Sequence, residues 1–334
     1  MKKIFITDYF EESVIEKEIL GHNVEVICLN QKDEEKFPDE IKEADGLLVW
    51  HSEVTEKTFK KLKRCKAVVR YGVGYDNIDI KSANRLGIDF ANNPGYVTDE
   101  VADTTCGMIL TFIRKIYLYN NKCQFFKKGW QENVPKENII DNTRRSNEHK
   151  LGIIGAGRIG SAVAMRMKAF KMKIGFFDPN VHSGYEKTLG TDRYDNLDDL
   201  IKNSTVISIN ADLNNETRGM INESFINKLA NHTILVNTAR GAIVDKLDTL
   251  YEGIKKGKLS GVGLDVLPEE PPSEHEKLIK AWKDKKNPIS DKILINPHSS
   301  FYSSRSIVEM RINAAENIAR SIKGLKLKNI IKTN

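Results

Sequence analysis

The sequence of 334 residues lacks long hydrophobic runs, because charged residues interrupt every apolar stretch. None approaches the roughly 18 residues that a membrane-spanning helix needs, which excludes an integral helical membrane protein. The first ten residues, MKKIFITDYF, place an aspartate directly after a short apolar run. That pattern does not predict a signal peptide, so we expect no membrane partner.

Cysteine is scarce, and the four that occur form no CxxC pair and no zinc-finger spacing. We therefore expect reduced thiols in a cytoplasmic protein without a metal site. The chain also contains no HExxH and no GxSxG sequence, which argues against a zinc hydrolase or a nucleophilic hydrolase. The four cysteines are Cys28, Cys65, Cys106 and Cys123.

A strong excess of one charge is also missing. There are 52 basic and 46 acidic residues, a net charge of +6, and the lysines are scattered apart from a mild cluster at 322–332. A solvated lysine-rich surface explains this pattern better than a nucleic-acid interface does, so no nucleic-acid partner is expected.

What the sequence does contain is a regular alternation of strand-like and helix-like stretches. It runs through the first hundred residues and restarts at residue 150. Such alternation predicts the α/β class, with parallel sheets covered by helices on both faces. The pattern predicts one long helix beginning at Thr98 or Asp99, a surface arm or loop over 120–148, and a last helix that returns the chain to the first domain.

The segment KLGIIGAGRIG carries a dinucleotide-binding motif between an apolar strand and an amphipathic helix. Gly155 makes the tight turn, Gly157 lets a pyrophosphate approach the backbone, and Gly160 lets helix and strand pack closely. Asp178 ends the next strand, where a carboxylate accepts ribose hydroxyls, and no arginine follows it directly. The motif therefore predicts NAD rather than NADP, although a glycine turn in a non-binding domain stays an alternative. The other predicted contacts in the motif are Ala156, Arg158 and Ile159.

Three chemically complementary residues follow three strands of the second domain. Arg240 comes after HTILVNTA, Glu270 after LSGVGLDV, and His298 after DKILIN. Ligands bind outside the carboxyl ends of parallel strands, so these side chains are expected at one edge of the sheet. Taken singly, each has another reading: a surface arginine, a solvated carboxylate and a capped histidine.

Together the three residues suit the reduction of a 2-oxo acid. An arginine fork grips a carboxylate. A histidine donates a proton to a carbonyl oxygen, and a neighbouring carboxylate holds its ring and favours the protonated form.

The motifs GAGRIG, NTARGAIVD, GLDVLPEEP and NPHSSFYS occur in the order found in D-2-hydroxyacid dehydrogenases, and RYGVGYDNIDI and VADTTCGMIL extend the match into the first half. The chain thus resembles that family, and most of all the branch of the C-terminal binding proteins and their bacterial relatives. The resemblance implies a flavodoxin-like substrate domain, residues 1–99 plus 301–334, into which a Rossmann NAD-binding domain, residues 100–300, is inserted.

The resemblance also implies roles for individual residues. Arg240 binds the substrate, Glu270 tunes the histidine, and His298 is the general acid in reduction. Backbone N–H groups of Gly72, Val73 and Gly74 meet the substrate carboxylate, and a Gly-x-Gly turn is independently a plausible anion nest. Further implied cofactor contacts are Ala211, Thr217, Thr238, Ala239, Asp265 and Thr104 or Thr105, and Arg70 is an implied substrate contact with a surface arginine as its alternative.

One position departs from the C-terminal binding proteins. Three residues after the histidine, where they carry tryptophan, this chain has Phe301. The smaller ring changes the predicted substrate pocket, and we expect Trp50, at another strand end, to fill part of the space. The sequence thus predicts an NAD-dependent homodimer that reduces a small 2-oxo acid to the D-2-hydroxy acid. The alternative is an NADH-sensing, co-repressor-like protein-binding module with slow chemistry.

Overall fold

The computed structural model describes residues 1–8, 10–124, 130 and 143–332, and the chain divides into two compact units. The first unit contains Met1–Val97 and Tyr302–Asn334, and the second contains Thr98–Phe301. Most of the arm predicted over 120–148 lies outside the described residues. No helix in the described ranges is long and apolar enough to cross a bilayer.

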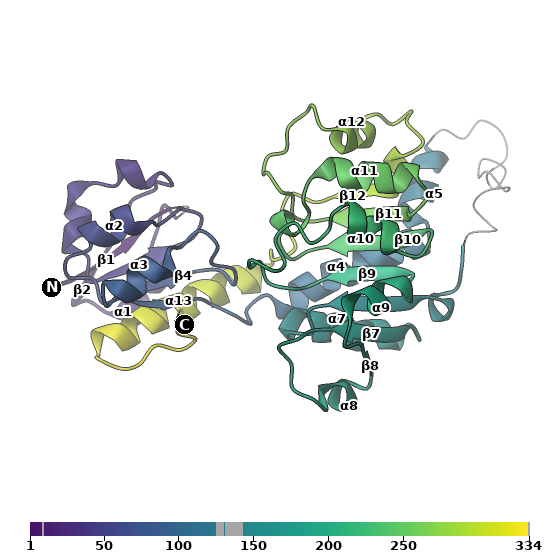
Figure 1. Ribbon diagram of the computed structural model, residues 1–334. Helices are drawn as coiled ribbons and strands as arrows, with labels where there is room; N and C mark the ends of the chain where they lie inside the picture. The colour runs from purple at the N-terminus through teal and green to yellow at the C-terminus, as the bar shows by residue number, and fades with distance from the viewer. Residues whose placement is uncertain (9, 125–129, 131–142, 333–334) are drawn as a thin grey trace. The chain divides into compact units, whose positions relative to one another are not determined.

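The first unit is built on five parallel strands in the order β2-β1-β3-β4-β5 (Figure 1). This order is the flavodoxin-like one, with a single reversal of direction along the sheet. The strands are β1 Lys2–Ile6, β2 Val24–Cys28, β3 Gly46–Val49, β4 Ala67–Arg70 and β5 Asp89–Ala91. The helices are α1 Val14–Leu20, α2 Glu56–Lys61, α3 Ile80–Arg85 and α13 Ser304–Ile322, with 3-10 turns at Glu34–Lys36 and Asp39–Glu43.

The C-terminal helix α13 completes the first unit. A Cβ on Gly46 would lie 3.1 Å from Cδ1 of Ile318, so α13 packs directly on β3. Arg311 of α13 donates two hydrogen bonds to the fully buried Glu16 of α1, at 2.8 and 2.5 Å. Tyr71 donates a third to Glu16 at 2.9 Å. A carboxylate without solvent contact is thus paired with an arginine, which is what burial of charge requires.

A second buried carboxylate, Asp8, fixes the loop after β3. Its oxygens accept hydrogen bonds from the backbone N–H groups of Trp50, His51 and Ser52 at 3.0–3.3 Å, and from the hydroxyls of Thr7 and Ser52. Burial raises the pKa of the Asp8 carboxyl, but the bonds from His51, Thr7 and Ser52 outweigh it and hold the pKa well below its usual range.

We expect Asp8→Asn to destabilise the protein by about 2–3 kcal/mol at pH 7, because an amide cannot satisfy all of these donors. A depressed folded-state pKa gives stability that is present above the unfolded value of about 3.9 and is lost as pH falls below it. The difference between wild type and variant in urea unfolding should therefore shrink between pH 5 and pH 3. An equal difference at both pH values would contradict the role of the ionised carboxylate.

The second unit is built on seven parallel strands in the order β12-β11-β10-β9-β6-β7-β8 (Figure 1). This is the dinucleotide-binding order 3-2-1-4-5-6 with one further strand, and its direction reverses between β6 and β9. The predicted class of two doubly wound α/β domains is confirmed. The strands are β6 Lys150–Ile154, β7 Lys173–Phe177, β8 Asp192–Arg193, β9 Val206–Ile209, β10 Thr233–Asn237, β11 Leu259–Leu264 and β12 Ile293–Ile295.

Helices cover both faces of this sheet with separate apolar cores. α4 Thr98–Ile113 and α7 Arg158–Ala169 contribute to one core. The other core contains residues of α9 Leu197–Lys202, α10 Glu223–Lys228, α11 Leu247–Lys255 and α12 Lys277–Lys283. The remaining elements are α5 Ile116–Cys123, α8 Tyr185–Leu189 and 3-10 turns at Ser146–Glu148, Gly241–Ile243 and Ser290–Lys292.

The prediction of one long helix from Thr98 is wrong in one respect. The chain forms α4 and α5 with a break at Lys115, whose φ of 57° is left-handed. Apolar residues continue at helical spacing through the break, which is why periodicity alone does not reveal it.

Candidate active site

The glycine-rich turn between β6 and α7 has the geometry of a phosphate cradle. Gly155 has a φ of 91°, and a Cβ there would lie 2.6 Å from the backbone nitrogen of Ala211. A Cβ on Gly160 would lie 2.0 Å from the carbonyl oxygen of Gly155, whereas Gly157 faces open space. Gly157 caps α7, so N–H groups of Arg158, Ile159 and Gly160 have no partner within the helix. Such a helix start attracts phosphate.

Asp178 lies beside this turn at the end of β7. One carboxylate oxygen accepts a hydrogen bond from the N–H of Ala156 at 2.8 Å, and the other accepts from Asn180 at 2.8 Å. The carboxylate is therefore held against the glycine turn, and its contact with ribose hydroxyls stays a prediction. Each oxygen keeps a further lone pair for a hydroxyl group.

The turn and Asp178 together fit an NAD molecule. Two of its glycines admit no side chain, the third leaves space beside free N–H donors, and a carboxylate lies at the end of the next strand, the position that binds ribose hydroxyls in dinucleotide-binding folds. Of the other predicted contacts, Ala211 packs on Gly155. Thr217 closes the neighbouring loop, where its hydroxyl donates to the carbonyl of Asp212 at 2.7 Å.

The loop after β10 is organised by Asn237, a fully buried residue that the sequence analysis missed. Its side-chain oxygen accepts from the N–H of Ala239 at 3.0 Å, and its amide donates to the carbonyl of Arg240 at 3.0 Å. Thr238 shares a 2.7 Å hydrogen bond with Thr105 of α4. Of the two threonines considered for α4, Thr105 is thus the one in contact with this loop, and Thr104 is its neighbour on the helix.

Glu270 and His298 form the central pair of the site. His298 Nδ1 lies 2.8 Å from Glu270 Oε2, and the N–H of Leu267 donates to Oε1 at 2.8 Å. Burial raises the pKa of Glu270, but the bonds from His298 and Leu267 and the charge of Arg240 hold it below its usual range. An ionised Glu270 accepts the Nδ1 proton, which leaves Nε2 as the ring nitrogen that can face a substrate.

His298 itself is held in a left-handed conformation, with a φ of 52°. Its N–H donates to the carbonyl of Asp265 at 2.8 Å. The Asp265 carboxylate, 2% exposed, accepts from the N–H groups of Ser299 and Ser300 at 2.9–3.2 Å. Such strain in a non-glycine residue persists only where its surroundings fix it, and Asp265 provides that fixation.

A close backbone contact holds the loop that carries Arg240 at the same edge of the sheet. A Cβ on Gly241 would lie 1.8 Å from the carbonyl oxygen of Leu267, so the loop after β10 packs against the segment that carries Glu270. Arg240 donates from Nη1 to the carbonyl of Ala239 at 2.8 Å. The structure thus brings Arg240, Glu270 and His298 together at the carboxyl ends of β10, β11 and β12.

The predicted substrate residues of the first unit form a second cluster around the end of β4. Arg70 ends β4 and donates from Nε to Asn77 at 3.1 Å, and a Cβ on Gly72 would lie 1.5 Å from its Nη1. The carbonyls of Gly72 and Val73 accept from the N–H of Asn93 and the amide of Asn92 at 3.1 and 2.7 Å. The turn is therefore held through the carbonyl groups of Gly72 and Val73, and a side chain at position 72 would displace the Arg70 guanidinium from its present place.

The two aromatic residues that the sequence predicts in the substrate pocket are Phe301 and Trp50. Phe301 meets the His298 ring edge-on, with centroids 6.1 Å apart. Trp50 is 4% exposed and stacks between Phe10 and His51, so most of its ring is used for packing inside the first unit. The substrate role of Trp50 stays a prediction.

Comparisons with known proteins identify the family of this chain. Residues 106–300 match the family described as D-isomer specific 2-hydroxyacid dehydrogenase, NAD binding domain. The chain is 33% identical over 300 residues to C-terminal-binding protein 1 of Caenorhabditis elegans, covering 89% of this chain and 40% of that longer protein. It is 31% identical over 287 residues to a glyoxylate reductase of Korarchaeum cryptofilum, covering 84% and 80%.

Solved structures show the same relationship. The crystal structure of D-lactate dehydrogenase from Aquifex aeolicus, complexed with NAD and lactic acid, is 31% identical, with a TM-score of 0.79 over 96% of both chains. A glyoxylate reductase from Paecilomyes thermophila has a TM-score of 0.84 at 24% identity and supports the fold alone. The family resemblance predicted from the motifs is confirmed.

Proposed function

Because the chain belongs to the D-isomer-specific 2-hydroxyacid dehydrogenase family, with NAD as cofactor, we propose that it reduces a small 2-oxo acid to the D-2-hydroxy acid with His298 as proton donor. The observation that carries the proposal is the 2.8 Å contact between His298 Nδ1 and Glu270. It fixes the ring and leaves Nε2 for the carbonyl oxygen of a substrate.

In this mechanism Arg240, His298 and Glu270 of the second unit each have one task. Arg240 binds the substrate carboxylate and orients the neighbouring carbonyl group. His298 protonates the carbonyl oxygen, and Glu270 stabilises the charged imidazole before transfer. NADH, when bound, supplies the hydride. In the reverse reaction His298 accepts the proton of the hydroxyl group.

Two relatives and Phe301 bear on the size of the proposed substrate. Glyoxylate and lactate, named for two relatives, are both small 2-oxo or 2-hydroxy acids. Phe301 lies edge-on to His298, at the position where the C-terminal binding proteins carry tryptophan. We therefore expect a substrate preference unlike theirs. We propose that the turn at 72–74 and Arg70 also contact the substrate, as the resemblance implies.

A panel of 2-oxo acids tests the function directly. We expect NADH consumption with at least one of glyoxylate, pyruvate, hydroxypyruvate and branched or thioether 2-oxo acids. Tight NADH binding without turnover on any of them would contradict the enzymatic proposal. That result would favour the alternative of an NADH-sensing binding module, which the similarity to C-terminal-binding protein 1 motivates.

Glu270→Gln tests the proton-donor pair through pH. The variant loses the charge that favours protonated imidazole, so we expect the alkaline limb of the kcat/KM profile for reduction to move to lower pH by about 1 unit or more. Glu269→Gln, an exposed neighbour, is the matched control and should keep the wild-type profile. An unshifted profile in Glu270→Gln would show that the carboxylate does not act on the proton donor.

We also propose a homodimer in the cytoplasm. The four cysteines are all unpaired, which suits a reducing compartment. Sedimentation equilibrium of the full chain measures the oligomeric state.

A further inference from the structure

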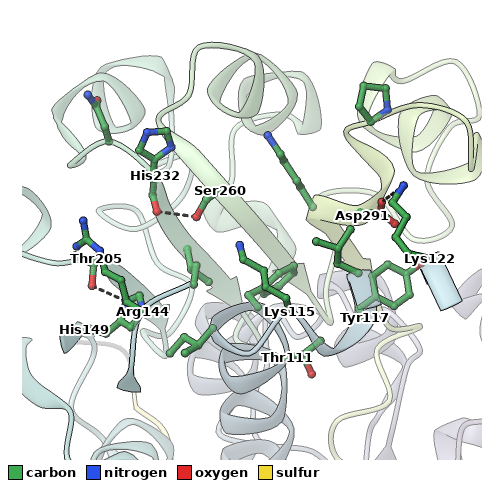
Figure 2. A pocket seen from close by; sticks show the side chains of 17 residues that line it. Thr111, Lys115, Tyr117, Lys122, Arg144, His149, Thr205, His232, Ser260 and Asp291 are labelled. Carbon is green, nitrogen blue, oxygen red and sulfur yellow. Dashed lines mark hydrogen bonds and ion pairs between the residues drawn. The ribbon is translucent and has the colours of Figure 1, made fainter. Parts of the chain in front are cut away.

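The second unit holds a cavity of about 560 Å³ (Figure 2). It lies at the edge of the sheet where the strands begin, whereas Arg240 and His298 follow the ends of β10 and β12. Thr205, His232 and Lys292 each immediately precede a strand and line it. All strand pairs in this sheet are parallel, so their first residues meet at one edge. The cavity is thus separate from the proposed active site.

The lining of this cavity is strongly cationic. Lys115, Lys122, Arg144 and Lys292 contribute to it, whereas Asp291 is the one acidic side chain among the described lining residues. Asp291 is already engaged, because Lys122 lies 3.3 Å from it and Asn121 donates to it at 2.9 Å. The remaining three cations have no acidic partner within the described lining.

Lys115 lies at the centre of the cavity lining in Figure 2, at the break between α4 and α5. Burial lowers the pKa of its ammonium group, and the charge of Lys292 lowers it further. The negative C-terminal end of α4 attracts a cation, which explains the presence of Lys115 just after that helix. The helix dipole does not explain why two further cations, Arg144 and Lys292, gather beside a lysine that is partly removed from water.

His149 adds an unsatisfied nitrogen to the same wall. It is 9% exposed, and its Nδ1 lies 3.1 Å from the hydroxyl of Thr205. That hydroxyl also accepts from the N–H of Lys150 at 3.0 Å and donates to the carbonyl of Lys150 at 3.4 Å. Nε2 is buried and has no partner among the described residues, and in the tautomer that carries the ring proton on Nε2 it is an unpaired donor. An orphaned buried donor costs free energy unless a ligand or water satisfies it.

We propose that this cavity binds a small oxyanion with more than one negative charge, such as a phosphate ester or a tricarboxylate. Lys115, Lys292 and Arg144 supply the charge, and His149 Nε2 supplies a further donor in the tautomer that carries the ring proton there. Phe112 and Tyr117 give one wall an apolar surface for the carbon part of the ligand. The volume lies within the range of about 300–1,000 Å³ that small-molecule sites occupy.

The test is calorimetric titration of the NADH-saturated full chain with inorganic phosphate and, separately, with citrate. Saturation with NADH keeps the probes from the glycine-rich turn. We expect Lys115→Gln and Lys292→Gln each to weaken binding by about tenfold, which is about 1.4 kcal/mol. Lys187→Gln, an exposed lysine on α8 of the same unit, is the charge-matched control and should bind as wild type does. Arg240→Gln should also bind normally, because it alters the opposite edge.

Three outcomes would overturn the proposal. No binding of either probe by the wild type is the first. An equal loss in Lys187→Gln would indicate an adventitious ion only. Weakened self-association of Lys115→Gln in sedimentation, without probe binding by the wild type, would assign the cavity to a carboxylate of a second copy. Because Lys292 is exposed, Lys292→Gln keeps the test valid if Lys115→Gln does not fold.

Discussion

His298→Gln should lower kcat for 2-oxo acid reduction by about 10²- to 10⁴-fold, the range expected for loss of a general acid. This corresponds to about 3–5 kcal/mol of activation free energy. The expectation rests on the contact of Nδ1 with Glu270, which leaves Nε2 as the nitrogen that protonates the substrate. Glutamine has an amide of similar reach but cannot transfer a proton under these conditions. Single-turnover oxidation of NADH measures the effect on the chemical step.

NADH binding separates this effect from damage to the fold. The NADH affinity of His298→Gln should stay close to that of wild type, because the glycine turn and Asp178 belong to other strand ends. His182→Gln, an exposed histidine of the same unit, is the matched control and should keep full activity. Turnover of His298→Gln within a few-fold of wild type would show that another group donates the proton.

The convergence of Arg240, Glu270 and His298 could be predicted because a parallel sheet leaves little freedom in where strand ends lie. Each residue follows a buried apolar strand within a few positions, and the strands share one direction. The glycine motif was predictable for the same kind of reason, since two of its glycines are required by contacts within a short local turn. Local sequence and sheet direction together determine these positions.

The supporting hydrogen bonds could not be predicted, because they join residues far apart in the chain. Asp265 fixes Ser299 and Ser300 from 34 and 35 positions away, and Glu16 meets Arg311 from 295 positions away. Asn237 could have been identified from one feature of the sequence, a polar residue at the end of an otherwise apolar strand. No feature of the sequence indicates the break at Lys115, because the helical spacing of apolar residues continues through it.

The same limit applies to the cationic cavity. Its residues come from the starts of several strands and from the break between α4 and α5, so no segment of sequence contains the pattern. The sequence shows only scattered lysines, which indicate a solvated surface. Local sequence therefore predicts reactive residues that follow single strands, but it does not predict a cluster of charges contributed by the starts of several strands.

Arg240→Gln should reduce kcat/KM for the best 2-oxo acid by about a hundredfold to a thousandfold, about 3–4 kcal/mol. The guanidinium offers a planar fork of N–H donors that binds a carboxylate through two parallel hydrogen bonds. Gly241 and Leu267 hold the loop of Arg240 against the segment of Glu270, so the fork keeps a fixed place beside the proton donor. Steady-state kinetics with saturating NADH measure the loss.

Arg240→Lys separates charge from geometry. Lysine keeps the positive charge but offers a single point donor, so we expect it to recover only part of the activity. Arg218→Gln, an exposed arginine of the same unit, removes the same charge elsewhere and should leave kcat/KM unchanged. If Arg240→Lys matched wild type, the residue would act through its charge alone. If Arg240→Gln kept wild-type kcat/KM, the substrate carboxylate would be bound by another group, and the turn at 72–74 would be the next to test.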